Sequence, residues 1–304
     1  MLGRPIDGRE RHRRASSNLP PARPTQTSAS ALGAPRLKSY CLACRPGGVA
    51  AERPSSEILV MLNALKKLLG GGSKPTGPNL LPRDEAMRSS VDEFWRGWFE
   101  TKGADWPNDY RMRMDPNMPL NVELAQHAEK LDKDVIEILD VGAGPVSTVG
   151  KVMPGKTIKL TPTDVVAADY DRLIDEFKAP VPVRTIYADA EKLGEKFGAN
   201  AFDIVFAQNT VDHMERPLLA IDGMIECCRP GGLVFLRHQE NEGKANNYSR
   251  LHHWDFFLDD ATQHFKIRHV HGEEHDISER TKDRGTSRVY RVGKRFVWEF
   301  VKNP

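Results

Sequence analysis

An apolar segment that ends in an acid and a glycine turn, VIEILDVGAGP at residues 135–145, most constrains the fold of this chain. Its aliphatic and β-branched residues are typical of a strand buried on both faces of a sheet. Asp140 lies near its carboxyl end, and Gly142 and Gly144 follow at once. Residues 147–153 are expected to begin a helix whose first serine or threonine caps its amides. A strand, a glycine turn and a helix N-terminus bring backbone close to a ligand, so we predict a cofactor site here.

Charge and composition exclude several function classes. The 304 residues include 44 Lys and Arg against 42 Asp and Glu, a net charge of +2, so no nucleic-acid partner is expected. No apolar run reaches the roughly 18 residues of a spanning helix, so no membrane span is expected. Four cysteines, two of them adjacent at Cys227 and Cys228, do not form a disulfide framework and favour a reducing, cytoplasmic location.

The first part of the chain differs from the rest. Residues 1–56 are rich in Arg, Pro and Ser and poor in acids, so we expect a disordered tail. It reads as an organellar transit peptide or as an over-extended start upstream of Met61. Cys41 and Cys44 form a lone CxxC without the two further ligands that zinc needs. A short helix and a linker are expected over residues 57–82.

An N-terminal helical cap is expected over residues 83–133. Within it, residues 84–101 place apolar side chains at i, i+4, i+7, i+8, i+11 and i+12, a single stripe on one helix. The stripe carries Trp95 and Trp98, so it either packs on the following domain or lines a substrate pocket. Another helix is expected at 121–130.

Strands then alternate with helices. Strands are expected at 158–163, 183–187, 202–207 and 233–236, and helices at 168–177 and 217–228. This alternation predicts a parallel sheet covered on both faces. A further helix is expected at 250–264. Two strands, 266–272 and 288–301, are expected to pair antiparallel at one edge of the sheet.

Polar residues stand at the ends of four consecutive strands: Asp140, Asp164, Asp189 and Asn209. Ligands of open α/β sheets bind beyond the carboxyl ends of the strands. Asp164 follows Gly144 by 20 residues, the spacing typical of an acid that holds ribose hydroxyls. The sequence therefore predicts an adenosine-bearing ligand.

Two kinds of adenosine-bearing ligand must be distinguished: a nicotinamide dinucleotide with its pyrophosphate, and a ligand with an amino group and a sulfonium. A dinucleotide fingerprint that starts at Gly142 would have its third small residue at position 147, which is Ser147, an imperfect match. Asp140, two positions before that glycine, would repel a pyrophosphate but attract an amino group and a sulfonium. A cationic ligand is therefore favoured over a nicotinamide dinucleotide.

The sequence resembles the class I S-adenosylmethionine-dependent methyltransferases over about residues 135–240. The motifs that carry the resemblance are LDVGAGP (139–145), Asp164, ADAEKL (188–193), FDIVFAQN (202–209) and CCRPGGLVFL (227–236). It implies a doubly wound, mostly parallel, seven-stranded Rossmann-like methyltransferase sheet with an antiparallel edge strand, formed by an S-adenosylmethionine-binding domain over residues 134–304. Pro145 departs from the family pattern, because many members have a third glycine there. Residues 238–243 and 247–256 also resemble bacterial methyltransferases of surface-saccharide or secondary-metabolite pathways.

The resemblance also assigns roles to single residues. Asp164 would accept both ribose hydroxyls, while Asp189 and the Ala190 amide would meet the adenine. Gln208 and Asn209 would lie where the sulfonium meets the methyl acceptor. The full set of expected cofactor-binding residues is Asp140, Gly142, Gly144, Asp164, Asp189, Ala190, Gln208 and Asn209. The implied activity is methyl transfer from S-adenosylmethionine to a small-molecule or saccharide acceptor.

The acceptor's proton needs a base, and the candidates are His213, His238 and Glu240, with Asp212, His252 and His253 as further choices. His238 and Glu240 alternate at a strand end and so should point the same way. A metal site of His238, Glu240 and His252 lacks HxH or HxxxH spacing, so no metal is expected. The rival functions are an NAD(P)-dependent oxidoreductase and a non-catalytic cofactor-binding module.

Overall fold

The computed structural model describes residues 82–304. The predictions for the tail (1–56), for the Cys41–Cys44 pair and for the short helix before the linker lie outside the described residues. Within residues 82–304, no helix is long and apolar enough to cross a membrane.

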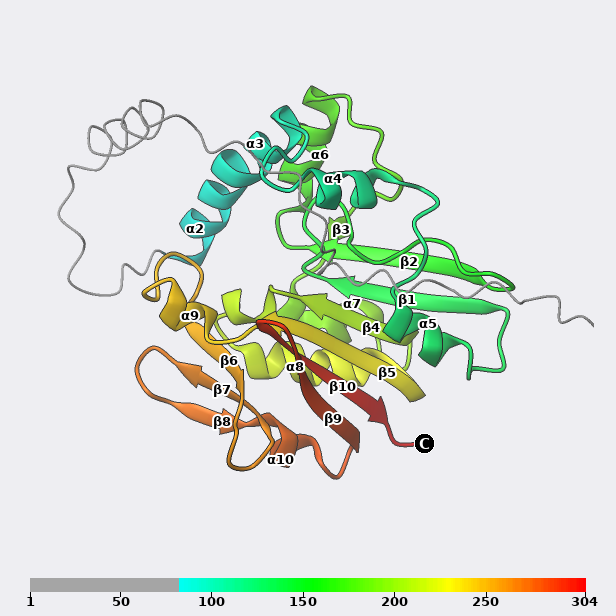
Figure 1. Ribbon diagram of the computed structural model, residues 1–304, viewed down its shortest axis with the longest axis vertical. Helices are drawn as coiled ribbons and strands as arrows, with labels where there is room; N and C mark the ends of the chain where they lie inside the picture. Colours follow the sequence, from blue (N-terminus) through cyan, green and yellow to red (C-terminus); the bar gives the residue numbers. More distant parts are fainter. Residues whose placement is uncertain (1–81) are drawn as a thin grey trace, which may run out of the picture. The chain divides into compact units, whose positions relative to one another are not determined.

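A seven-stranded sheet forms the centre of this part of the chain, in the order β3-β2-β1-β4-β5-β10-β9 (Figure 1). The five strands on one side of it are all parallel. They are β1 (Val135–Val141), β2 (Thr157–Asp164), β3 (Ile186–Tyr187), β4 (Phe202–Gln208) and β5 (Cys228–Gln239). The predicted parallel sheet is confirmed, although the third strand is shorter and the fifth longer than expected.

The edge beyond β5 is antiparallel. β10 (Arg295–Lys302) pairs antiparallel with β5 on one side and with β9 (Gly285–Val292) on the other. The strand predicted at 288–301 is thus a hairpin of two strands at this edge. The expected doubly wound, mostly parallel sheet of seven strands with an antiparallel edge is confirmed.

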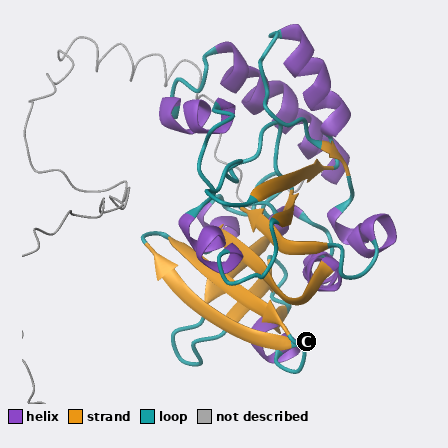
Figure 2. Ribbon diagram, turned by 90° about the vertical axis from the view of Figure 1, so that its right-hand side faces the viewer, coloured by secondary structure: helices purple, strands orange, loops and turns teal. Residues whose placement is uncertain are grey.

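Side chains of the sheet, whose strands are orange in Figure 2, are buried in two cores. Ile136 and Ile138 face one core with helix α5 (Val122–Ala128), whereas Leu139 and Val141 face the other. Helix α8 (Pro217–Cys227) packs in that second core. Helices therefore cover both faces of the sheet, and the central strands β1 and β4 are buried along most of their length.

The predicted helix over 84–101 is present in three consecutive parts. They are α2 (Arg83–Ser89), a π-helical segment (Ser90–Trp95) and α3 (Arg96–Glu100). Val91, Trp98 and Phe99 are buried in a cluster with side chains of α6 (Ala167–Glu176). Helix α3 lies beside α6 in Figure 1. Helix α4 (Pro107–Met114) follows. The boundary between a helical cap over residues 83–133 and a cofactor-binding domain over residues 134–304 stays a prediction.

The helix predicted at 147–153 is wrong, because tertiary contacts hold this segment open. Ser147 donates its hydroxyl to Asp140 and accepts the amide of Val149. Val152 forms an isolated bridge with Pro119, and a Cβ on Gly150 would lie 1.9 Å from the Pro119 carbonyl oxygen. The turn after β1 therefore leads into an irregular loop and presents no helix N-terminus.

The helix predicted at 250–264 is also wrong, because this segment contains β6 (Trp254–Leu258). Trp254, Phe256 and Leu258 are buried in this strand, and Asp255 is buried with them. β6 pairs with β7 (Phe265–His269), which pairs with β8 (Glu274–Asp276), and these three form a second sheet. The strand predicted at 266–272 therefore does not join the edge of the main sheet.

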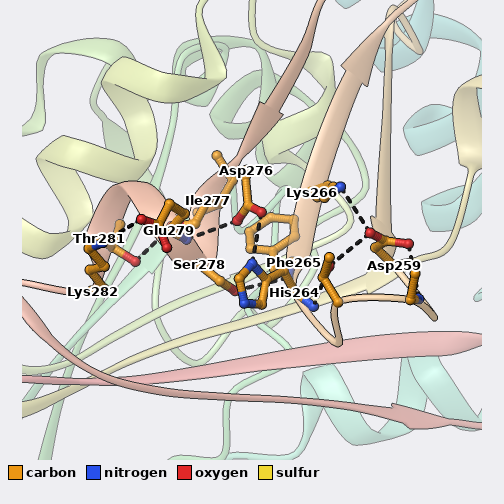
Figure 3. Close-up of polar contacts among 12 residues, drawn as sticks. Asp259, His264, Phe265, Lys266, Asp276, Ile277, Ser278, Glu279, Thr281 and Lys282 are labelled. Carbon is orange, nitrogen blue, oxygen red and sulfur yellow. Dashed lines mark hydrogen bonds and ion pairs between the residues drawn. The ribbon is translucent and has the colours of Figure 1, made fainter.

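Side chains fasten the second sheet to helix α10 (Ile277–Thr281), as Figure 3 shows. Asp276 caps the helix by accepting the amide of Glu279 at 2.8 Å, and its other carboxylate oxygen lies 2.8 Å from His264 Nδ1. Ser278 accepts the amide of Phe265 at 2.9 Å. The remaining elements are two 3₁₀ helices (Ala190–Lys192 and Val211–His213), α7 (Leu193–Phe197) and α9 (Glu242–Ala245).

Candidate active site

A cavity of about 640 Å³ opens at the carboxyl ends of β1, β2 and β4. The turn after β1 and the ends of β2 and β4 line one part of it, and the π-helical segment, α4 and the chain after β5 line the rest. Its volume falls within the range of about 300–1,000 Å³ that is typical of small-molecule sites. The cavity lies where the topology of an open α/β sheet places a ligand.

The glycine turn at the end of β1 depends on backbone that only glycine adopts easily. Gly142 and Gly144 have φ of +65° and +67°. A Cβ on Gly142 would lie 2.0 Å from the Thr210 hydroxyl oxygen, and one on Gly144 would lie 2.8 Å from the Trp95 ring. The turns after β1 and β4 therefore touch, and an indole ring rests on the backbone of Gly144.

Gly142→Ala should lower the free energy of unfolding by about 2–3 kcal/mol, because the methyl group adds a clash with Thr210 to the cost of positive φ. Gly155 is the matched control, since its φ is +73° but a Cβ there would meet open space. Gly155→Ala should cost only about 1–2 kcal/mol. Urea denaturation of both variants measures the difference, and equal losses would contradict the proposed contact.

Asp140 is a buried carboxylate that faces the cavity. It is 2% exposed and accepts the Ser147 hydroxyl at 2.5 Å. Burial raises the pKa of Asp140 to about 7, although the Ser147 hydrogen bond and the nearby Arg113 guanidinium act in the opposite direction. An acid in this state gains a counterion when a cationic ligand group binds beside it.

Asp164 is the second buried carboxylate of the cavity, and it is 7% exposed. It accepts the amides of Gly144 and Val166, each at 3.2 Å, and the Tyr170 hydroxyl at 3.5 Å. Burial raises the pKa of Asp164, although these hydrogen bonds oppose the shift. One amide from the turn after β1 and one from the chain after β2 thus hold the Asp164 side chain in one orientation, with its carboxylate at the cavity wall.

The end of β3 contributes a small hollow that adjoins the cavity. Asp189 caps the 3₁₀ helix by accepting the amide of Glu191 at 3.0 Å, and Ala190 lines the hollow. Met87 of α2 lies on its opposite side, and Asp164 is common to the hollow and the cavity. Of the predicted pair, Ala190 thus reaches the hollow, whereas Asp189 is not among its lining residues.

Gln208 and Asn209 line the cavity at the end of β4. Gln208 Oε1 accepts two hydrogen bonds from the Arg237 guanidinium, at 2.8 and 2.5 Å. Asn209 has a φ of +47°, and its side-chain oxygen accepts the amide of Gln239 at 3.0 Å. Contacts with β5 therefore fix both side chains.

The apolar stripe of the N-terminal helix lies partly in the core and partly on the wall of the cavity. Val91, Trp98 and Phe99 are buried in the core with α6, while Trp95 and Phe94 line the cavity. Trp98 also reaches the cavity wall. The π-helical turn that contains Phe94 and Trp95 widens the stripe, and such turns are frequent at functional sites.

A histidine cluster surrounds the fully buried Asp212 at one side of the cavity. Its carboxylate lies 2.9 Å from His252 Nδ1, 3.0 Å from His238 Nε2 and 3.5 Å from His213 Nε2. Burial acts to raise the pKa of Asp212, but the imidazoles hold it well below its ordinary value. Burial lowers the pKa of His213 to about 4. Burial also acts to lower the pKa of His252, but the hydrogen bond to Asp212 and the charges of Asp212 and Glu242 together outweigh it and raise this pKa.

The three candidate bases lie in different places. His213 lines the cavity, whereas His238 is 1% exposed and lies behind the wall, against Asp212. Glu240 is held away from both, because it binds the Arg291 guanidinium at 2.7 and 2.8 Å and accepts the amide of Leu258. The expectation that His238 and Glu240 point the same way is wrong, since β5 ends at Gln239 and the chain turns there.

Sequence reasoning missed several residues of this site. Asp212 appeared only as a further choice, yet it is the centre of the histidine cluster. Glu242 of α9 and Arg295 of β10 also line the cavity, although Glu242, within residues 238–243, was given no role and Arg295 lies in no motif. The one usable signal was the run Asp212–His213, which directly follows a buried strand.

The matching family model and the similar structures agree in kind. Residues 139–236 match a family described as a methyltransferase domain. No curated protein matches the sequence. The 1,6-didemethyltoxoflavin-N1-methyltransferase of Burkholderia thailandensis, solved with 1,6-didemethyltoxoflavin and S-adenosylhomocysteine, is 14% identical over 76% of this chain and 94% of its own, with a TM-score of 0.42.

Two further solved structures are similar at comparable levels. The CurJ carbon methyltransferase is 13% identical over 58% of this chain and 51% of its own, with a TM-score of 0.40, so the chain spans about half of that structure. An O-methyltransferase family protein of Burkholderia thailandensis is 13% identical over 81% of this chain and 70% of its own, with a TM-score of 0.39.

The residues present fit an adenosylmethionine. Buried Asp140 lacks a full counterion and so suits a cationic group, while buried Asp164 offers carboxylate oxygens at the same wall. The matched residues 139–236 contain the glycine turn and both of these acids. Residues 139–236 therefore form a methyltransferase domain, whose cofactor is S-adenosylmethionine.

Proposed function

We propose that the protein transfers a methyl group from S-adenosylmethionine to a small-molecule or saccharide acceptor that binds in the cavity. The observation that carries this proposal is that two buried carboxylates, Asp140 and Asp164, line one cavity beside the glycine turn of β1. A cation and a pair of hydroxyl groups in one ligand would satisfy them both.

Each cofactor contact is proposed from the position of the residue in or beside the cavity. Asp164 would accept the ribose hydroxyls, and the hollow at Ala190 would take the adenine, with Asp189 beside it. Asp140 and the backbone of Gly142 would meet the charged methionine end. The remaining proposed contacts come from Gly144, Gln208 and Asn209.

S-adenosylmethionine supplies a methyl group on a positively charged sulfur, which becomes neutral as the methyl group leaves. The protein's contribution is to hold the acceptor in line with that group and to exclude water, terms worth up to about 7–11 kcal/mol at ideal geometry. The aromatic wall of Phe94, Trp95 and Trp106 would pack on the acceptor. His213, whose imidazole lines the cavity and whose Nε2 has no hydrogen-bond partner among the described residues, would accept the acceptor's proton.

Calorimetric titration of the full chain with S-adenosylhomocysteine and, in parallel, with NADH tests the cofactor. We expect saturable one-to-one binding of S-adenosylhomocysteine and no saturable binding of NADH, because Asp140 repels a pyrophosphate. The reverse outcome would support the nicotinamide-dependent oxidoreductase instead.

A second assay separates an enzyme from a non-catalytic module. Release of S-adenosylhomocysteine from S-adenosylmethionine is followed with a panel of ring hydroxyl, ring amine and saccharide acceptors. Turnover of at least one class is expected. Tight cofactor binding with no turnover across the panel would favour a binding module.

A further inference from the structure

Three side chains from separate parts of the chain meet beside the cavity with unsatisfied atoms. Asp212 lies in the 3₁₀ helix after β4, His238 lies near the end of β5, and Glu242 begins α9. One nitrogen or oxygen atom of each lies within 4.8 Å of those of the other two. Asp212 is 0% exposed and His238 is 1% exposed, so two of the three are shut off from solvent.

The atoms that meet there are also the ones without hydrogen bonds. Asp212 Oδ1, His238 Nε2 and Glu242 Oε2 are buried and have no hydrogen-bond partner within residues 82–304. His238 Nε2 and Asp212 Oδ1 lie 3.0 Å apart, an ion-pair distance, so these two atoms also contact each other. Glu242 Oε2 has no hydrogen-bond partner within residues 82–304, and a buried polar group left unpaired costs about 1–3 kcal/mol, so a cation that binds all three atoms would satisfy it.

We infer that Asp212, His238 and Glu242 bind a divalent transition-metal ion at the side of the cavity. Two carboxylates and an imidazole carry the charge and the donor types that suit Zn²⁺, Mn²⁺ or Fe²⁺. Donors about 2.0–2.2 Å from a metal lie about 3–4.4 Å from one another, so small side-chain movements close the present spacing. The inferred metal site differs from the expectation of the sequence analysis, which is that no metal binds.

The surrounding residues support such a site. His252 Nδ1 lies 2.9 Å from Asp212 Oδ2 and so orients the carboxylate whose other oxygen faces the site. Metal-binding groups are usually held in this way by a second hydrogen-bonding residue.

The location of the metal site beside the cavity assigns it a role in binding the methyl acceptor, and this role rests on the proposed function. Glu242 lines the cavity, so three protein ligands leave open positions toward the space in which the acceptor binds. A metal there would bind an oxygen of the acceptor and lower the pKa of its hydroxyl group. The acceptor class is then one with a hydroxyl or carbonyl oxygen next to the methylated atom.

Zinc binding by the chelator-treated full chain tests the site without any acceptor. We expect one equivalent of Zn²⁺ by elemental analysis after dialysis, and a rise in melting temperature on adding Zn²⁺. Glu242→Gln and His238→Gln should each weaken Zn²⁺ binding, measured by calorimetry, by at least about 10-fold. Mg²⁺ should bind far more weakly, because it disfavours imidazole.

Two control variants address zinc bound elsewhere. His264→Gln removes a histidine of similar pairing, with Asp276 at 2.8 Å, in the second sheet (Figure 3). His271→Gln breaks the surface pair with His269, whose rings are 4.9 Å apart. Both should keep the single equivalent of Zn²⁺. Loss of binding in a control but not in Glu242→Gln would overturn the assignment.

A measurement on the wild-type protein covers the case in which His238→Gln does not fold. Zinc X-ray absorption should show imidazole nitrogen together with carboxylate oxygen as ligands. A spectrum of imidazoles alone, or no stoichiometric Zn²⁺, would overturn the proposal. S-adenosylhomocysteine titration of the metal-free protein is run beside it, since continued binding there shows that a failed metal site leaves the proposed methyl transfer standing.

Discussion

Asp164→Ala is expected to weaken S-adenosylhomocysteine binding by about 100-fold or more. Hydrogen bonds to a charged acceptor are worth about 1.5–3 kcal/mol each, and two ribose hydroxyls would lose theirs together. The buried position of Asp164, 7% exposed, leaves no water to replace the carboxylate. Calorimetric titration of the variant measures the loss.

The same carboxylate also supports the protein, so the variant needs a control. Asp164 accepts the amides of Gly144 and Val166, and its loss loosens the glycine turn. Asp169→Ala removes an exposed acid of helix α6 that lies 3.6 Å from Arg172, and it should leave binding unchanged. A folded Asp164→Ala protein, checked by circular dichroism, that binds the ligand as tightly as wild type would refute the ribose assignment.

The sequence predicted the sheet correctly because its signals are local. β1 and β4 are short, mostly apolar runs, whereas β2 alternates apolar and polar residues and ends on Asp164. Asp140 and Asp164 therefore come to one edge of the sheet once the strands are recognised. The contacts of Asp140 and Asp164 with the cofactor stay a prediction, because a sequence pattern does not show which ligand atoms a side chain contacts.

The missed elements depend on contacts between distant residues. Residues 147–153 have helix-compatible composition, but the Ser147 hydroxyl bonds to Asp140 and the backbone of Gly150 lies against Pro119. The strand β6 forms by pairing with β7, and four of its five residues are buried, Asp255 included, so no apolar–polar alternation marks it in the sequence. Tertiary packing overrode local preference in both cases.

The histidine cluster is the clearest limit of sequence reasoning. Asp212, His238 and Glu242 lie on three elements, and nothing in their spacing links the first to the others. The expected partner of His238 was Glu240, two residues on. Because the strand ends between them, Glu240 instead pairs with Arg291 and Glu242 takes the place beside His238.

Asp140→Asn is expected to stabilise the unliganded protein while weakening its binding of S-adenosylhomocysteine. Burial raises the pKa of Asp140 from 3.8 to about 7. Between about pH 4 and pH 7 the folded protein keeps a proton that the unfolded chain releases, so wild-type stability falls as the pH rises through this window. Above pH 7 the ionised carboxylate costs up to about 4 kcal/mol, a cost that the amide lacks.

Urea denaturation of both proteins at pH 8 and pH 5 should therefore show a stability advantage for Asp140→Asn that is largest at pH 8 and shrinks toward pH 4. At pH 8 the variant should bind S-adenosylhomocysteine at least about 10-fold more weakly, since a neutral amide gives no ion pair with the ligand's amino group. Adenosine lacks the α-amino group of the homocysteine part. It is therefore the matched ligand and should bind both proteins alike. A variant less stable than wild type at pH 8 would contradict the buried-charge argument. Equal weakening for both ligands would place Asp140 away from the cationic end, because only a contact with that end discriminates between them.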